Sequence, residues 1–404
     1  MPTLARRLRI GCQLAVAVAT LIVGASPALE AQSPRGTSSA PGWVFTPGVS
    51  VAETWDNNVL LATEGSETVG DFLTAVTPRA ALSFRGRLTT LQFDYRGSFQ
   101  LYQQLSDLNA YDQRSNSSFR QRLSPTMTLF ARNSLSRSPS TDEVDLPGIL
   151  FRRQGVLIDD FRTGLEARLS SRTSLSGAYV FQWVNFDEDP TTPPSSFLDR
   201  SGYANGAEAE FDHVLTPRLT VGAEYDMRHA NVGEFREFDI QNAMGTVDYR
   251  LGARYSLSGG AGLSWLHTTL TDVGRSAPAF RVSLNRSGER VAWNVSYRKS
   301  FLPSVGFGGT FQNQEFQAGF FAPLTRRLDL SGSMAMVEAD ALTTAELGLR
   351  SIWARSSVSY AASRYLRVEG FYIAVFQDSR RAGGHINRSR VGIQVVTSTR
   401  TRIR

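Results

Sequence analysis

Strict alternation between apolar and polar residues is the feature that most limits how this chain can fold. It is clearest in HVLTPRLTVGAEYDM (213–227), where the residues after Pro217 take turns. The apolar positions are Leu219, Val221, Ala223, Tyr225 and Met227, and those between them are small or charged. A period of two is typical of a β-strand with one dry and one wet face. The pattern recurs in segments 91–102, 161–169 and 291–298, so the sequence predicts an all-β fold whose dry face meets a protein core or lipid.

The connections between these segments separate the two possibilities. Tight connections recur at 84–88, 123–127, 169–173, 215–219, 251–255, 286–290, 324–328 and 362–366. Longer polar segments fall between them, such as 137–159, 187–200, 229–239, 268–277, 302–312 and 379–388. Outer-membrane barrels have short periplasmic turns and longer extracellular loops, whereas a soluble sandwich gives no reason for this order. We therefore predict a transmembrane antiparallel up-and-down β-barrel of about 18 strands, with short periplasmic turns and long extracellular loops.

The N-terminal segment indicates export. Three arginines (Arg6, Arg7 and Arg9) precede an apolar run over 14–25 and then small residues as far as Ala31. This order is typical of a secretory signal peptide, and an uncleaved anchor is the alternative, although the apolar run is short for a membrane span. We predict a signal peptide over 1–31, a flexible leader over 32–42, the barrel over 43–397 and a basic C-terminal tail over 398–404.

Charge and composition limit the partners. The net charge is +6 and is spread along the chain without a dense basic run, which gives no indication of nucleic-acid binding. The single cysteine, Cys12, lies inside the predicted signal peptide, so the exported chain would contain no thiol. We expect an outer-membrane location, with membrane lipid and the barrel-insertion machinery as partners. The C-terminal sequence VGIQVVTSTRTRIR lacks the terminal aromatic residue of many such barrels, and the sequence leaves the oligomeric state open.

The polar faces of the predicted strands would line the lumen. These positions are basic on the early strands and acidic on two adjacent later strands. The predicted lumen-lining charged residues are Arg79, Arg85, Arg96, Arg114, Arg120, Arg132, Glu208, Glu210, Asp212, Glu224 and Asp226. Two interpretations stay open. The residues form opposed basic and acidic walls that orient polar solutes, or they pair with one another and hold the barrel wall.

The dry faces carry aromatic residues near the ends of the strands, as expected at a membrane interface. They are Trp183, Trp265, Tyr249, Tyr255, Phe301 and Phe376. Lys299, the only lysine, also falls on the dry face. We place it at the outer end of its strand, where its amine could reach the lipid headgroups.

Motifs for catalysis or metal binding are scarce. The four histidines (His213, His229, His267 and His385) have no metal-ligand spacing and no obvious Ser, Asp or Glu partner. We therefore predict no catalytic residue, no metal and no cofactor, and an enzyme is a minor alternative. Asp56, Asn57 and Asn58 are best interpreted as a turn. Together with Glu64, Glu67 and Asp71 in segment 56–71, they could also supply oxygen ligands to Ca²⁺ or a sugar.

Two segments near the N-terminus resemble a known family. FTPGVSVAETWDNNVLL (45–61) and the stretch 73–99 are similar to β-barrel outer-membrane proteins encoded with exopolysaccharide and exosortase loci. The resemblance rests on an aromatic-x-Asp-Asn-aliphatic turn, here Trp55 to Val59, and on a Thr-Pro strand start, here Thr77-Pro78. It implies an outer-membrane barrel that passes polysaccharide or assists its secretion, and it supplies no catalytic residue.

Taken together, these patterns predict a conduit without a covalent step. The main hypothesis is that it assists exopolysaccharide export across the outer membrane, with polysaccharide as a partner. A general diffusion porin for small polar solutes is the first alternative. A non-conducting scaffold or assembly protein is the second, and a lumen blocked by inward Phe371, Ile373 and Ile352 would favour it.

Overall fold

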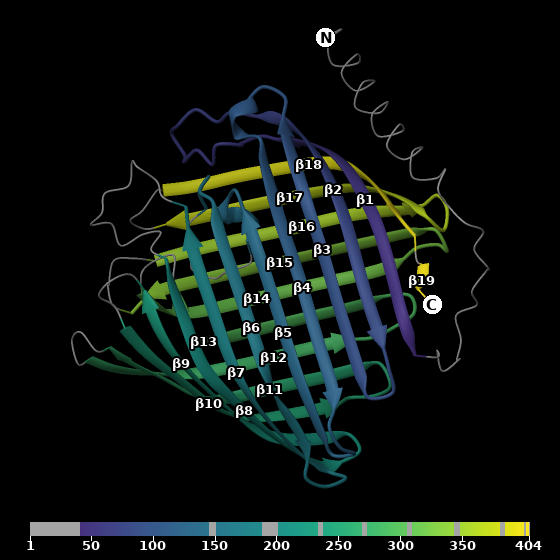
Figure 1. Cartoon of the computed structure of the whole chain (residues 1–404). Coiled ribbons are helices and arrows are strands. Elements are labelled where there is room, and N and C mark those ends of the chain that lie inside the picture. Colours follow the sequence, from purple (N-terminus) through teal and green to yellow (C-terminus); the bar gives the residue numbers. More distant parts are fainter. Residues whose placement is uncertain are drawn as a thin grey trace.

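The chain forms a closed antiparallel β-barrel in a computed structural model (Figure 1). The structure describes residues 41–144, 151–187, 201–232, 237–268, 273–304, 309–342, 348–379, 384–399 and 401–403. The predicted signal peptide lies outside these residues. Within the described part, eighteen long strands and one short strand make a single sheet, which confirms the predicted fold class.

The strands follow one another around the barrel in sequence order. Their bounds are β1 (Gly42–Asp56), β2 (Asp71–Arg85), β3 (Thr89–Tyr102), β4 (Ala110–Arg122), β5 (Met127–Ser138), β6 (Val156–Arg168), β7 (Thr173–Phe186), β8 (Gly202–Thr216), β9 (Leu219–Val232), β10 (Glu237–Arg250), β11 (Tyr255–Thr268), β12 (Val273–Arg286), β13 (Ala292–Ser304), β14 (Gly309–Pro323), β15 (Leu328–Ala341), β16 (Gly348–Ala361), β17 (Leu366–Ser379), β18 (Gly384–Ser398) and β19 (Thr401–Ile403). Two short 3-10 helices, η1 (Ser106–Leu108) and η2 (Thr141–Glu143), lie in connections.

The barrel closes where the first and last long strands meet. β1 pairs with β18 from Gly48 opposite Ser398 to Asp56 opposite Arg390. The segment predicted as a basic tail includes β19, which extends this closure by pairing Phe45 with Thr401. Every edge of the sheet is therefore paired at the closure, which removes the exposed strand edges that an open sheet would carry.

The two rims differ in their connections. On one, called here the turn rim, neighbouring strands are joined by tight turns such as the one between Thr216 and Leu219. On the other, the loop rim, three connections are long: 57–70, 139–155 and 187–201. The predicted loops at 229–239, 268–277, 302–312 and 379–388 are shorter than expected, because the strands extend into them. Polar residues there find partners on the neighbouring strand, as when His229 Nδ1 contacts Asp239 Oδ1 at 2.9 Å.

The strand register carries each face of the alternating pattern around the barrel. Glu208 lies opposite Asp226, and Asp226 opposite Asn242, so the polar positions of adjacent strands share the lumen side. The apolar positions share the outer side. On β8–β12 they include Tyr225, Trp265 and Val282, all with exposed side chains. Among the described residues, no helix is long and apolar enough to cross a membrane.

Candidate functional site: a charged lumen narrowed at the loop rim

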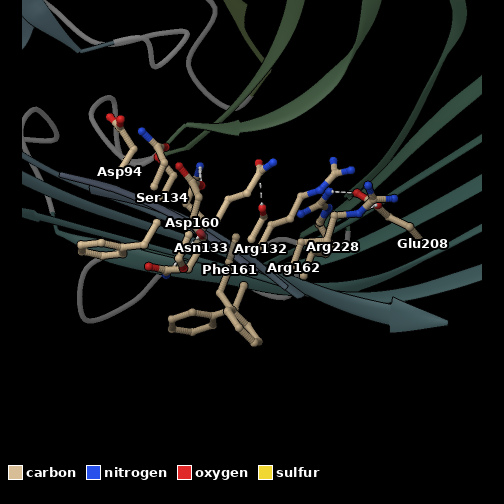
Figure 2. Close-up of a pocket in the computed structure, with 18 of the residues that line it drawn as sticks. Asp94, Arg132, Asn133, Ser134, Asp160, Phe161, Arg162, Glu208 and Arg228 are labelled. Atoms are coloured by element: carbon tan, nitrogen blue, oxygen red, sulfur yellow. Dashed lines mark hydrogen bonds and ion pairs between the residues drawn. The ribbon is translucent and has the colours of Figure 1, made fainter. Parts of the chain in front are cut away.

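A cavity of about 880 Å³ lies on the lumen side of strands β2–β9. Its wall carries four arginines and four carboxylates: Arg79, Arg132, Arg162, Arg228, Asp94, Asp160, Glu208 and Asp226. Figure 2 shows Arg132, Arg162 and Arg228 on one side of the sheet and Phe161 on the other. The strand alternation thus places charge inside the barrel and the aromatic ring outside it.

All eleven residues predicted to line the lumen lie on the inward face. The strand register places Arg79 opposite Arg96 and Arg96 opposite Arg114, so three arginines form a row across β2, β3 and β4. Arg132 lies opposite Arg162 on β5 and β6. On β8 and β9, Glu210 lies opposite Glu224. Their part in passage through the lumen stays a prediction.

Ion pairs within one strand or between strands up to three apart neutralise many of these charges. Glu208 accepts contacts from Arg162 at 2.8 Å and from Arg228 at 2.5 Å. The other pairs on this wall are Arg228–Asp226 (2.7 Å), Arg281–Glu224 (2.6 Å), Arg79–Asp94 (2.5 Å), Arg114–Asp112 (3.3 Å) and Arg120–Glu166 (2.7 Å). These paired residues therefore fit the interpretation in which the charges pair with one another and hold the barrel wall.

The hypothesis of opposed basic and acidic walls is wrong in its geometry. In the closed strand order only β6 and β7 separate β2–β5 from β8–β9, so the two groups belong to one stretch of wall. Charges without a partner remain on both parts. Within the described residues, no ion pair joins Arg96 or Arg132 on one part, nor Glu210 or Asp212 on the other.

In the connection between β5 and β6, the described residues 139–144 and 151–155 fold inward; we call them the inner loop. Its Asp142 forms an ion pair with Arg388 on β18, and its Glu143 accepts a 3.1 Å contact from Arg390. Further along, the Phe151 amide donates to Gln377 Oε1 on β17 at 2.7 Å. The inner loop thus reaches from β5 and β6 to β17 and β18, across the mouth formed by β1–β4.

Arg388 lies at the centre of this contact and is fully buried. Its Nε donates to Asp56 Oδ2 at 2.8 Å, and its guanidinium also pairs with Asp142. Both carboxylates have no exposed side-chain surface. Two buried carboxylates around a guanidinium are stable together, but each is costly when its partner is lost.

The buried surroundings of Asp142 change the pKa of its carboxyl. Burial alone would raise its pKa, but Arg388, Arg390 and a hydrogen bond from Ser140 lower the pKa below its usual value. Because the pKa of this carboxyl is lowered on folding, its ionised form stabilises the attached inner loop. That stabilisation is fully present at pH values above the pKa of an aspartate in the unfolded chain, near 3.9. The contact is lost as the pH falls through the lower, folded pKa.

We therefore expect the inner loop to stay attached at neutral and mildly acidic pH. The single-channel conductance should rise only when the pH falls through the lowered pKa of the folded Asp142 carboxyl, below the value of the unfolded chain, as Asp142 takes up a proton. Conductance recorded in planar bilayers from neutral pH downward measures this. Asp142→Asn should remove the step, and a wild-type conductance that stays flat through this range would contradict the role of the carboxylate.

The Trp55–Val59 turn has a structural task at the barrel closure. Asp56 binds Arg388, and the Ser389 amide donates to Asn57 Oδ1 at 2.6 Å. Asn58 Nδ2 donates to the carbonyl oxygens of Ala62 and Asn387. These contacts fasten the 57–70 connection to β18, so the turn interpretation is confirmed.

The Ca²⁺ interpretation of segment 56–71 finds no support. Asp71 accepts hydrogen bonds from the amides of Gln104 and Leu105, and Asp56 is occupied by Arg388. Glu64 and Glu67 are exposed on the connection. In the part of the chain that the structure describes, no group of three or more His, Cys, Asp or Glu side chains is arranged to hold a metal ion.

A second element narrows the lumen at the loop rim. β12 and β13 pair only from Phe280 opposite Lys299 to Arg286 opposite Trp293. Beyond Lys299, β13 stays paired with β14 but leaves β12, and its Phe301 amide donates to Ser264 Oγ on β11 at 3.3 Å. Leu302 and Pro303 line the charged cavity. We call Ser300–Pro303 with the paired Thr310–Phe311 the inward tip.

The inward tip packs on an apolar cluster inside the barrel. The buried members are Val156, Ile158, Val184, Phe186, Val232, Phe238, Ile240, Leu266 and Phe301, and Val144, Ala277 and Leu342 pack against them. Phe301 is therefore not on the lipid face, as the alternation predicted, because β13 has left the wall at that point. The cluster and the inner loop together restrict the lumen at the loop rim.

Three further predictions about side chains need correction. Ile352 lies opposite Phe376 on the outer face, whereas Phe371 and Ile373 lie on the inner face, as predicted. Lys299 is not at the end of its strand, since β13 continues to Ser304. Histidine partners do exist: His385 Nδ1 contacts Asp378 at 3.2 Å, and His213 Nδ1 lies 3.0 Å from Thr173 Oγ1.

Comparisons with known proteins add a likeness in overall shape. No protein-family model matches the chain, and no curated protein does. A solved structure of OccAB4 from Acinetobacter baumannii is 10% identical, with a TM-score of 0.47, and the match covers 90% of this chain and 99% of that one. The outer membrane protein OpdK from Pseudomonas aeruginosa is 13% identical, with a TM-score of 0.45 over 88% of this chain and 99% of that one. All these TM-scores lie below 0.5, so the fold described above rests on its strand pairings alone.

Some functional residues could not be found from the sequence. Arg388 lies in a segment predicted as a loop, far along the chain from Asp56 and Asp142. The closure of β1 on β18 brings Arg388 to Asp56, and the inward fold of the inner loop brings Asp142 to both. The length and acidity of segment 137–159, which contains Asp142 and Glu143, were only a weak sign of this contact. Acidic residues in a loop lie outside the alternating pattern, so the sequence does not indicate what they pair with.

Proposed function

We propose that this protein is an outer-membrane channel through which small polar solutes diffuse. The single observation that carries the proposal is the closed barrel with an apolar outer face and a charged cavity inside. Such an outer face is stable in lipid, where every backbone group must be paired within the protein. The turn rim then faces the periplasm and the loop rim the cell exterior.

The narrowing at the loop rim favours small solutes over a polymer. The inner loop and the inward tip both occupy the lumen there and are held by buried contacts. A polysaccharide chain in transit would need both displaced at once. The motif behind the family resemblance serves the barrel closure in this chain, so it does not favour polysaccharide export over diffusion.

Planar-bilayer recording tests the proposal. The folded mature chain should give discrete single-channel steps in simple salt, and added neutral polysaccharide should leave them unchanged. A chain that inserts but gives no steps would support the scaffold alternative. Steps blocked by polysaccharide at low concentration would support export.

If the outer face lies in lipid, an arginine placed at neighbouring residues of β12 should destabilise the barrel to very different extents. Val282 is exposed on the outer face, whereas Ser283 faces the lumen. Val282→Arg should destabilise the barrel in lipid vesicles by about 2–4 kcal/mol, because it places a charge near the bilayer midplane. Ser283→Arg, the matched control, should cost far less. Denaturant unfolding followed by tryptophan fluorescence measures both, and equal losses would contradict the assignment.

The unpaired carboxylates predict ion selectivity. Glu210→Lys with Asp212→Lys should shift the reversal potential in a salt gradient toward anions, since both side chains face the lumen without an ion pair. Glu289→Lys changes the same charge outside the lumen, in the turn between β12 and β13, and should leave the reversal potential close to wild type. An unchanged potential in the double variant would count against a solvated lumen at this position.

A further inference from the structure

The wall of the barrel is interrupted between β12 and β13. The part of β12 nearer the loop rim, Gly274–Ala279, pairs with β11 but has no rung with β13 in the described structure. We call this interruption, bounded by Gly274–Ala279 and by Ser300–Pro303, the seam. The other ladders between long strands are longer, and a shorter gap of two rungs lies at Thr77–Pro78 between β2 and β3.

The sequence explains why the ladder stops here. Pro278 lies in the seam and has no backbone N–H, and proline is tolerated in strands only at edges or bulges. Gly274, Ser276 and Ala277 beside it are small. β12 is therefore built as an edge over this stretch, not as a central strand that has lost its partner.

The seam lies at the depth of the membrane. Ser276 is paired with Trp265, an exposed aromatic residue of the outer face, and the seam ends one rung above Phe280, whose side chain is also exposed. Unpaired backbone groups at this depth are costly unless water or another molecule satisfies them. The lumen is the adjacent source of water.

An apolar surface lies directly behind the seam. Ala277 of β12 packs against the cluster that contains Leu266 and Phe301. The inner face of the barrel is otherwise polar at most positions, so this cluster is an apolar surface on the lumen side of β11, beside the seam.

Two cations border the seam: Arg275 lies within it on the inner face, opposite Leu266, and a second cation stands at its other end on the outer face. Lys299, the only lysine of the chain, is on the outer face at the last rung before β13 turns inward. Its neighbours in register are Phe280 and Gln314, and no ion pair joins it within the described residues. An uncompensated cation on the lipid face of a barrel is destabilising, and an anionic ligand would offset that cost.

We propose that the seam is a lateral port for a single-chain amphiphile with a carboxylate head. The acyl chain lies along the apolar cluster and passes between β12 and β13, while Lys299 binds the carboxylate. This inference rests on the proposed channel. It adds a second class of solute, which leaves the lumen through the barrel wall into the membrane. The inward tip, held at Ser264, is the element that must move for the chain to pass.

The test uses dansyl-labelled undecanoic acid and the full barrel in detergent. The fluorescence titration should show saturable binding to the wild-type protein. Lys299→Gln should weaken binding about tenfold, which corresponds to about 1.4 kcal/mol, and Lys299→Arg should restore most of it. The methyl ester of the probe should bind wild type and Lys299→Gln equally. Arg286→Gln removes another outward cation of β12 and should not change the affinity.

A second measurement does not depend on Lys299. The variant Ser264→Cys with Phe301→Cys joins the inward tip to β11 by a disulfide, and the mature chain has no other thiol if the predicted signal peptide is removed. In vesicles, oxidation should stop transfer of the labelled acid from the lumen into the bilayer, and a reductant should restore it. Small-ion conductance should continue in both states.

The outcomes separate the two proposals. Conductance without any effect of Lys299→Gln or of the disulfide on the labelled acid overturns the lateral port and leaves the channel standing. Loss of small-ion conductance in the wild-type protein overturns the channel instead. Equal binding of the acid and its ester to wild type would also overturn the role of Lys299.

Discussion

Replacing Arg388 with methionine is expected to destabilise the folded barrel by about 3–5 kcal/mol, the largest effect of any single substitution considered for this chain. Arg388 is fully buried and pairs with Asp56 and Asp142, which are fully buried too. Methionine fills part of the space but leaves buried Asp56 without a charged partner, and Asp142 with only Arg390, 3.6 Å away. The cost of stranding a buried charge far exceeds the small net value of the ion pair itself.

Denaturant unfolding of the barrel in lipid vesicles measures this loss. The control is Arg79→Met, whose ion pair with Asp94 is well exposed and should contribute at most about 1 kcal/mol. A triple variant, Arg388→Met with Asp56→Asn and Asp142→Asn, removes the stranded charges and should recover much of the loss. A stability of Arg388→Met within error of wild type would show that the carboxylates are not buried as described.

The second large effect concerns the inner loop. Asp142→Asn with Glu143→Gln keeps the side-chain shapes but removes the charges that bind Arg388 and Arg390. We expect the inner loop to detach from β18 and the single-channel conductance to rise several-fold, because the loop rim is where the lumen is narrowed. Recordings in planar bilayers at neutral pH measure it.

The matched control for this prediction keeps the charges of the inner loop and removes a lumen charge elsewhere on the wall. Glu166→Gln breaks an exposed pair with Arg120 on the lumen wall, away from the inner loop, and should leave the conductance near wild type. If the double variant conducts like wild type, the inner loop does not limit the passage of ions. The inward tip would then be the narrower element.

The alternating pattern was enough to predict the barrel, because few other folds are compatible with a period of two that recurs at a regular spacing. Parity along a strand also fixes the face of every residue, and the strand register groups the charges predicted to line the lumen on one face. Parity fails where a strand leaves the wall. Phe301 has the parity of a lipid-facing residue but packs inside, because the ladder between β12 and β13 stops at Lys299.

Pairing across the lumen was beyond the sequence for a different reason. Glu208 on β8 reaches Arg228 on the neighbouring β9 and Arg162 two strands away on β6, and Asp142 reaches β18, which closes the barrel from the far end of the chain. Such contacts depend on strand order and tilt and not on local spacing. Pro278 was the one local signal of the seam, since proline inside a long strand marks an edge.

The claim on which the rest depends is that one face of each strand meets lipid and the other meets water. A cysteine scan along Leu219–Met227 tests it directly, because the mature chain is predicted to contain no other thiol. In vesicles, a membrane-impermeant thiol reagent should label cysteines at Thr220, Glu224 and Asp226 and leave those at Val221, Ala223 and Tyr225 unlabelled. Equal labelling along the strand, or labelling of the apolar positions instead, would contradict the account.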